Sequence, residues 1–324
     1  MAQPTNSFMQ FDYSLRPSKQ VERRIMIEVL LRLSKAGYPI EDYSYLGLGS
    51  PYYVDFVMFH KYLFIHDMVC VEWADVPKRM RFNKPFKFIK LRMGALSTHI
   101  PRMPLKKKHL VWLDYDRSLD PDMLQDIDGC LNRMAPKSIL VITIDARAKL
   151  PKDYAPEVEA MKESEREQLT AETYQEWLSN YVGEAITRPT ISAGHVAPLF
   201  YEVVVERIRH TLSTRVPSLR FLQIFHFVYK DGAPMLTIGG MIGTGEDEEA
   251  LDRACIFKHE FVRVDGDHLA ISVPPLTLRE KQWLESRLDK KLTAAKLRFE
   301  LEEDLLENYR RFYRQYPTYM ETVL

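Results

Sequence analysis

The chain has 324 residues, enough to bury a substantial core or to carry one core with a large appendage. Its 45 basic and 45 acidic residues cancel, so the overall charge gives no argument for nucleic acid or for an anionic membrane surface. Three scattered cysteines without a CxxC pair argue against structural zinc and a disulfide framework. No apolar run is long enough to span a bilayer, and the first residues lack a basic segment and an apolar core. These features predict a cytoplasmic protein without a membrane partner.

The N-terminal region predicts an arm followed by a helix. Residues 1–17 show no clear periodicity and are expected to lie over the body as an arm. Ser18 is a candidate N-cap for a helix from Lys19 to Ala36, and Gly37 ends it. One apolar stripe supports this helix, formed by Val21, Ile25, Val29 and Leu33.

The next stretch has the pattern of a nucleoside-binding βαβ unit. A strand is expected from Tyr43 to Leu48, interrupted by Gly47 and followed by Gly49, and a helix is expected from Tyr53 to Leu63. A second strand from Met68 to Glu72 ends in an acid. In such a unit the glycines let the backbone turn beneath a ligand, and the acid accepts hydrogen bonds from ribose hydroxyls. The alternative interpretation is an ordinary strand exit, because glycine pairs also mark simple turns.

Three further strands complete the predicted sheet. They span Phe86–Leu91, which Gly94 closes, then Leu110–Asp114 and Ser138–Asp145, the most hydrophobic of the set. A helix from Asp122 to Met134 separates the last two. Five strands alternating with helical crossovers predict an α/β fold, a doubly wound and mostly parallel Rossmann-like sheet with helices on both faces.

The segment after the fifth strand changes character. Residues Leu150 to Thr187 are charged and helical in pattern, so about 150–190 is interpreted as a helical insertion that covers the strand ends. A helix from Pro198 to Arg215 follows. Two strand-like runs, Phe221–Tyr229 and Pro234–Ile242, are joined by a turn with Asp-Gly and predict an antiparallel hairpin that closes the sheet.

An acidic run from Glu246 to Glu249 is interpreted as a domain boundary. Residues 1–245 are therefore expected to form the Rossmann domain, and residues 246–324 an α+β appendage at the C-terminus. The appendage is expected to contain a second hairpin, then a helix capped by Thr277, then a longer amphipathic helix. The hairpin is placed at Phe257–Val264 and His268–Val273, and the longer helix at Leu297, Leu301 and Leu305.

This order of elements resembles the class I S-adenosylmethionine-dependent methyltransferases. More narrowly, four segments are similar to a poorly characterised group of bacterial proteins known as putative O-methylases: Tyr45–Phe56, Arg81–Phe86, Val111–Asp116 and Tyr313–Glu321. The resemblance implies the fold and S-adenosylmethionine as cofactor, and it suggests a setting among bacterial defence genes. One departure is that Ser50-Pro51 follows Gly49 where such loops usually carry a small residue. Proline offers no amide proton, which reduces the contacts available to the methionine carboxylate.

The resemblance also implies which residues form the site. The expected cofactor-binding residues are Leu46, Gly47, Gly49, Ser50, Glu72 and Gly94. Asp114 and Asp116 follow the fourth strand, beside the transferred methyl group, and are expected to orient the substrate or accept its proton. The alternative places Asp116 in a solvated turn. A weaker hypothesis is that Asp114 and Asp145 emerge side by side and bind Mg²⁺, unless Asp145 simply pairs with Arg147.

Three other groups of residues have both a functional and a structural interpretation. Arg16, Lys19 and Gln20 open the first helix, where an anion could bind, although a surface helix start is more common. Cations mix with aromatic residues at Arg79, Arg81, Phe82, Lys84 and Phe86, as on nucleic-acid surfaces, although a solvated face is the more common case. His195 precedes a helix and is a candidate base, although a lone histidine is more often structural.

The leading hypothesis is methyl transfer from S-adenosylmethionine to an unidentified acceptor, with oxygen as the expected acceptor atom. The competing hypothesis is a non-catalytic nucleotide-sensing or scaffolding subunit of a bacterial defence complex that keeps the methyltransferase fold. Such a subunit would hold protein partners through the insertion or the C-terminal helices. A third and weaker hypothesis is modification of nucleic acid, with residues 79–90 as the basic contact.

Overall fold

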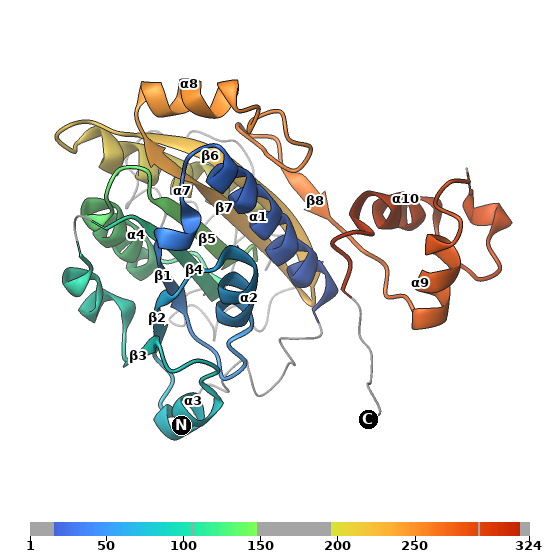
Figure 1. The fold of residues 1–324 in the computed structure, drawn as a ribbon, viewed down its shortest axis with the longest axis horizontal. Coiled ribbons are helices and arrows are strands. Elements are labelled where there is room, and N and C mark those ends of the chain that lie inside the picture. The colour runs from blue at the N-terminus through green and yellow to red at the C-terminus, as the bar shows by residue number, and fades with distance from the viewer. Residues whose placement is uncertain (1–15, 105–106, 148–195, 291, 318–324) are drawn as a thin grey trace, which may run out of the picture.

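The computed structural model describes residues 16–104, 107–147, 196–290 and 292–317. Its centre is an eight-stranded sheet in the order β3-β2-β1-β4-β5-β7-β6-β8 (Figure 1). The strands are β1 Ser44–Leu48, β2 Asp67–Glu72, β3 Ile89–Met93, β4 His109–Ser118, β5 Ile139–Asp145, β6 Arg220–Asp231, β7 Ala233–Gly243 and β8 Leu269–Ile271. β1 to β5 are parallel, whereas β7 runs antiparallel to both β5 and β6. The predicted five crossover strands and closing hairpin are confirmed.

Helices cover both faces of this sheet. The helices are α1 Pro17–Lys35, α2 Val54–Leu63, α3 Pro77–Asn83, α4 Pro121–Arg133, α7 Ala197–Ser213, α8 Gly245–Arg253, α9 Leu278–Glu285 and α10 Glu303–Phe312. Short 3-10 turns are η3 Ile40–Asp42, η4 Leu96–Thr98, η5 Ile100–Arg102 and η8 Ala294–Lys296. Apolar residues of α1 and α2 form one core with one face of the central strands, and those of α4 and α7 form a second core with the other face.

The two cores follow from the alternation of side chains along the strands. On β4, Leu110 and Trp112 belong to the core under α1 and α2, whereas Val111 and Leu113 belong to the core under α4 and α7. β5 is buried at every position, as expected for a strand whose two faces are both covered. The carboxyl ends of the parallel strands therefore emerge at one edge between two helical layers.

The start of α1 differs from the sequence prediction. Arg16 rather than Ser18 is the N-cap, and Pro17 is the first helical residue. Proline suits this position because the amide that it lacks would have no partner within the helix. Ser18 lies inside the first turn of the helix and its side chain caps no amide. The backbone amide of Ser18 donates a hydrogen bond to Asp231.

The third strand is also displaced from its predicted position at Phe86–Leu91. β3 begins at Ile89, and the amide of Ile89 donates to the carbonyl of Phe86 across a turn. Phe86 and Phe88 stack on each other, with ring centroids 5.2 Å apart, in the turn that precedes β3. In the sequence these two apolar residues alternate with polar ones, as in a strand, although here they pair with each other before the strand begins.

The second hairpin predicted near the C-terminus is wrong. Residues 257–261 form turns and 262–264 have no regular structure; the buried residues of this range, Phe261 and Val262, are adjacent and do not alternate with exposed ones. β8 is a strand of three residues that pairs in parallel with β6 and so joins the main sheet. The acidic run at 246–249 lies in α8, whose N-terminus has a capping box formed by Thr244 and Asp247.

The C-terminal helices form a small core of their own beside the sheet (Figure 1). Thr277 caps α9, as predicted, and forms a capping box with Glu280. α10 begins only at Glu303, so the prediction that Leu297 and Leu301 belong to one long helix is wrong, and the backbone at Leu297 is extended. The small core is centred on Leu284, Leu306, Tyr309 and Tyr316.

Several predicted features lie outside the described residues. These are residues 1–15 of the arm, the whole of the 150–190 insertion and the candidate base His195. In the described part of the chain, no helix combines the length and the apolar character needed to cross a membrane. The division into residues 1–245 and 246–324 stays a prediction.

Candidate site at the strand ends

The carboxyl ends of β1, β2 and β3 bring most of the predicted site residues together. The amide of Gly49 donates to the carbonyl of Val71 at 2.7 Å, which holds the loop after β1 against the end of β2. The amide of Gly94 donates to the carbonyl of Glu72 at 2.8 Å. The loops after the first three strands therefore meet around Glu72.

The two glycines of the loop are required by packing. A Cβ atom at Gly47 would collide with the hydroxyl of Tyr45, which donates a hydrogen bond to Asp55 on α2. A Cβ atom at Gly49 would lie 2.7 Å from the sulfur of Cys70 and 3.2 Å from the Cβ of Glu72. The glycines therefore seat the β1 loop on β2 whether or not they also contact a ligand.

The other two loop residues differ in what they present. The side chain of Leu46 is buried in the core under α4 and α7, so only its backbone faces the loop. Ser50 is partly exposed, and its hydroxyl accepts a weak hydrogen bond from the amide of Tyr52 at 3.4 Å. Tyr53 adopts a left-handed backbone with φ of 49°, and its hydroxyl donates to the carbonyl of Met80. These contacts fix the loop between β1 and α2.

Glu72 is the most unusual acid at this edge. Only 7% of the residue is exposed, and its Oε1 accepts a hydrogen bond from the amide of Ala74 at 2.8 Å. Burial raises the pKa of Glu72 to about 7, despite this amide, and the nearby charge of Asp116 acts in the same direction. The amides of Ala74 and Trp73 both act to lower this pKa but do not offset burial, so the carboxylate gains from any further hydrogen-bond donor that a ligand brings.

Asp114 is tied to the start of α1. Its Oδ1 accepts from Nζ of Lys19 at 2.8 Å, and the same ammonium lies 2.9 Å from Glu22. Lys19 and Glu22 have no exposed side-chain surface, whereas the Asp114 side chain is 27% exposed. The Lys19 ammonium also lies 4.5 Å from the centroid of the Trp112 ring. Asp114 is thus fixed through one carboxylate oxygen by a buried ammonium group, and part of its side chain stays exposed.

This ion pair continues into a chain of hydroxyl groups through the sheet. Thr237 donates to Glu22, and the hydroxyls of Thr237 and Thr143 lie 2.8 Å apart. The indole nitrogen of Trp112 donates to Thr143 at 3.0 Å. The chain therefore connects β4, β5, β7 and α1 behind Asp114 and fixes the position of Lys19.

Asp116 and Asp145 are not drawn into this network. Asp116 is exposed at the end of β4. β4 and β5 are neighbours, as the metal hypothesis requires, but Asp114 is in register with Thr143, and Asp145 with Ser118. Asp145 is 1% exposed and forms a two-pronged pair with Arg147, at 2.9 Å to Nε and 2.6 Å to Nη2.

The expected side-by-side placement of Asp114 and Asp145 is therefore wrong, because the register of β4 against β5 sets Asp145 two residues beyond Thr143, the partner of Asp114. Each carboxylate already has a cation of this chain as its partner. Within the described residues, no group of three or more His, Cys, Asp or Glu side chains could hold a metal ion. The donor set at the strand ends does not fit Mg²⁺.

The predicted anion site at the start of α1 is filled by the chain itself. The amides of Ser18 and Lys19 donate to the two carboxylate oxygens of Asp231, at 3.2 and 2.8 Å. Asp231 lies at the end of β6, beside the hairpin turn. The positive end of the helix is thus bound to the sheet, and Lys19 serves Asp114 rather than an external anion.

Two residues of the site region were not predicted as members, namely Glu22 and Tyr45. Lys19 and Glu22 are three residues apart and lie on one face of α1 among apolar residues. Two opposite charges at this spacing in an apolar stripe indicate a buried ion pair. Tyr45 gives no such signal, since tyrosine is common in strands.

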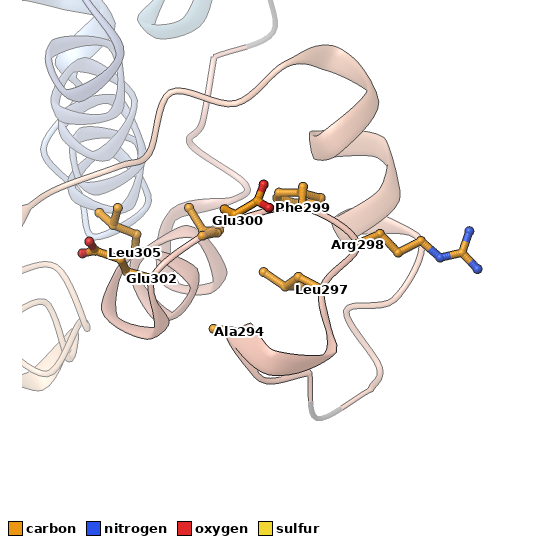
Figure 2. A pocket seen from close by; sticks show the side chains of 8 residues that line it. Ala294, Leu297, Arg298, Phe299, Glu300, Glu302 and Leu305 are labelled. Atoms are coloured by element: carbon orange, nitrogen blue, oxygen red, sulfur yellow. The ribbon is translucent and has the colours of Figure 1, made fainter.

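Two surface hollows are lined by residues other than the predicted site residues. One of about 790 Å³ lies among the residues before and at the start of α10, as Figure 2 shows, and Leu297, Phe299 and Leu305 contribute apolar side chains to it. The other, of about 390 Å³, lies between α3 and β3. Its lining residues are Arg81, Lys84, Ile89, Lys90, Leu91, Arg92 and Met93.

Comparison with known proteins gives a family for almost the entire chain. The model of a family described as "Putative O-methyltransferase" matches residues 11–324. No curated protein matches.

Solved structures of low identity are also similar. Trm1 from Pyrococcus horikoshii, in complex with S-adenosyl-L-methionine, is 11% identical with a TM-score of 0.44, covering 72% of this chain and 57% of that protein. The N-methyltransferase NodS from Bradyrhizobium japonicum WM9, in complex with S-adenosyl-L-homocysteine, is 11% identical with a TM-score of 0.35, covering 68% and 87%. The S-adenosylmethionine-dependent methyltransferase SibL is 11% identical with a TM-score of 0.35, covering 65% and 56%. The chain thus spans less than two thirds of SibL and Trm1.

Proposed function

The chain belongs to the family described as "Putative O-methyltransferase", and from this premise we propose that it transfers a methyl group from S-adenosylmethionine to a hydroxyl oxygen. The observation that supports cofactor binding best is Glu72, an acid at the carboxyl end of β2 whose pKa burial raises to about 7. Such a carboxylate gains from two hydroxyl donors, and ligands of open α/β sheets bind at this edge.

The residues present fit the adenosine half of the cofactor better than the methionine half. Glu72 would accept hydrogen bonds from the ribose hydroxyls, and Gly49 of the β1 loop packs against its side chain. The amide of Gly49 is already bound to the carbonyl of Val71, and Pro51 has no amide. The methionine carboxylate would therefore depend on side chains more than on loop amides.

Asp114 is our candidate for the group that acts on the acceptor. S-adenosylmethionine supplies a methyl group bonded to a positively charged sulfur, and an acceptor hydroxyl must lose its proton as the new carbon–oxygen bond forms. One oxygen of Asp114 is held by Lys19, and the partly exposed side chain can accept that proton or orient the hydroxyl. Alignment of the acceptor oxygen with the methyl group supplies most of the remaining rate.

Calorimetric titration with S-adenosylhomocysteine tests the proposed cofactor site directly. We expect saturable one-site binding by the wild-type chain and at least tenfold weaker binding by Glu72→Ala, because the ribose loses its acceptor. Glu249→Gln, an exposed acid on α8, is the matched control and should bind as the wild type does. Equal affinity of Glu72→Ala and the wild type would remove Glu72 from the site.

Asp114→Asn tests the role at the acceptor. This variant should bind S-adenosylhomocysteine within about twofold of the wild type, while methyl transfer to any acceptor that the wild type uses falls by about 10²-fold or more. Undiminished turnover by Asp114→Asn would exclude Asp114 as the proton acceptor.

The second candidate is a non-catalytic subunit of a bacterial defence complex that keeps the fold. It is favoured by one observation, the scarcity of free amides at Gly49 and Pro51. In this case neither S-adenosylmethionine nor S-adenosylhomocysteine would bind to the folded protein, and partners would bind through the insertion or the C-terminal helices. The three cysteines are unpaired, which supports a proposed setting in the cytoplasm for either function.

A further inference from the structure

The positive charge of this neutral chain is concentrated in one segment. Between Asp75 and Asp114 the sequence contains eleven lysines and arginines and no aspartate or glutamate. The chain as a whole has 45 residues of each sign, so this segregation is a local feature that the net charge conceals. The segment includes α3, β3 and the loops that connect them to β4.

The structure gathers part of this charge into a groove. β3 is the last strand at its end of the sheet, and the hollow of about 390 Å³ runs between β3 and α3. Four of its seven lining residues are cationic, namely Arg81, Lys84, Lys90 and Arg92, and the first and last of these are exposed. At the start of β2, the single carboxylate of Asp67 is shared by Lys90 at 3.0 Å and Lys107 at 2.5 Å. The groove therefore has an excess of positive charge along its length.

Two exposed aromatic residues directly follow residues at or beside this groove. Phe82 is 89% exposed and follows the groove residue Arg81 on α3. Trp73 is 76% exposed and directly follows Glu72. Glu72 is in register with Met93, the groove residue at the carboxyl end of β3. These are the two most exposed aromatic residues in the described part of the chain. Their rings are available for stacking on a planar ligand.

Protection of a sheet edge explains only part of this arrangement. Lysines and arginines on an edge strand discourage pairing with another chain, which accounts for Lys90 and Arg92. It does not account for Arg81 on the facing helix or for a phenylalanine ring held in water beside it. Cations that follow an extended groove, with aromatic rings at its sides, form the arrangement that binds single-stranded nucleic acid.

We propose that the groove between α3 and β3 binds single-stranded DNA or RNA. The phosphates lie along Arg81, Lys84 and Arg92, and a base stacks on Phe82. β3 spans five residues, or about 13 Å, so the groove contacts a few nucleotides and reads no defined sequence. This inference is independent of methyl transfer and holds whether or not the strand is the methyl acceptor.

Fluorescence anisotropy with labelled twenty-nucleotide poly(dT) and poly(rU) tests the groove. Binding should weaken as NaCl rises from 50 to 200 mM, with a log–log slope of about −2 for three phosphate contacts. The exposed double variant Arg81→Glu/Arg92→Glu should bind at least tenfold more weakly and reduce the magnitude of that slope by about 1.4. Phe82→Ala should weaken binding by about tenfold and leave the slope unchanged, because stacking releases no counterions.

Arg253→Glu on α8 is the control for charge reversal, since its side chain is 71% exposed and distant in sequence from the groove. It should bind both oligonucleotides within about twofold of the wild type, and all variants should keep the wild-type melting temperature. Three results would overturn the inference: no saturable binding at 50 mM NaCl, equal weakening by the control, or preferential binding to phosphatidylserine vesicles. Affinity for S-adenosylhomocysteine, measured in parallel, distinguishes failure of the groove from failure of the proposed cofactor site.

Discussion

Glu72 is expected to make the stability of the ligand-free protein depend on pH. Because burial raises the pKa of folded Glu72 to about 7 from its ordinary value of 4.5, Glu72 binds its proton more tightly in the folded than in the unfolded state. Its stabilising contribution is complete below about pH 4.5 and is lost as the pH rises through 7. The difference is at most roughly 3 kcal/mol, from about 1.4 kcal/mol per pKa unit.

Glu72→Gln, a neutral side chain of the same shape, isolates this effect. Urea unfolding should show the variant more stable than the wild type at pH 8 and similar to it at pH 5. Saturating S-adenosylhomocysteine should narrow the gap at pH 8, because the ribose hydroxyls would stabilise the wild-type carboxylate. A stability difference that does not change between pH 5 and 8 would contradict the raised pKa.

At the scale of elements, α1 is held on the sheet by charge as well as by apolar packing. Lys19 is fully buried between Glu22 and Asp114, so Lys19→Ala would leave two carboxylates without their cation. Loss of one partner from a buried ion pair typically costs about 3 to 5 kcal/mol. We expect the free energy of unfolding to fall by about 3 kcal/mol, measured by urea titration at pH 7.

Lys19→Ala/Glu22→Gln provides the internal control for this prediction. Lys19→Ala leaves the buried carboxylate of Glu22 without a cation, and Glu22→Gln removes that negative charge. The double variant should therefore be more stable than Lys19→Ala alone. If the double variant loses the sum of the two single effects, the pair acts through packing and not through charge.

The elements could be predicted from sequence where their patterns are local. The strands that form β1, β2 and β5 and the helices α2, α4 and α7 follow from apolar periodicity and flanking glycines or prolines. The start of β3 and residues 257–264 could not, because the rings of Phe86, Phe88 and Phe261 stack on other aromatic rings and lie outside strands. Paired aromatic residues near a turn imitate the pattern of a strand.

The candidate site was predictable to a similar extent. The acid at the end of β2 and the glycine loop follow from their positions after predicted strands. The register of β4 against β5 could not be predicted, since the sequence indicates the two strands but not which of their residues pair, and it leaves Asp145 two residues beyond the partner of Asp114. The pairing of Lys19 with Asp114 joins residues 95 positions apart, and neither neighbourhood indicates the other.

At the scale of the whole molecule, the C-terminal part has its own core but shares α10 with the main body. Leu306 is 1% exposed and packs in the small core, whereas Phe312 stacks on Phe261 in the main core. Leu306→Ala should cost about 2 to 5 kcal/mol of local stability, because it leaves a cavity that the small core fills only in part. Limited proteolysis should then cut within residues 272–317 while the sheet stays intact.

Leu305→Ala is the comparison for this variant, since the neighbouring leucine is only partly buried. It should leave the rate of proteolysis close to that of the wild type. Faster cutting in the main sheet of Leu306→Ala, or equal rates for both variants, would show that the small core does not unfold separately.

The two ends of the sheet have a consequence for the behaviour of the protein at high concentration. β8 offers only three residues to an incoming strand, and β3 presents lysine and arginine side chains that repel a second copy. Electrostatic repulsion weakens as ionic strength rises, whereas a short strand stays short. Concentrated solutions should therefore stay clear at low salt, and a polyanion that covers β3 would remove its repulsion while occupying the same edge.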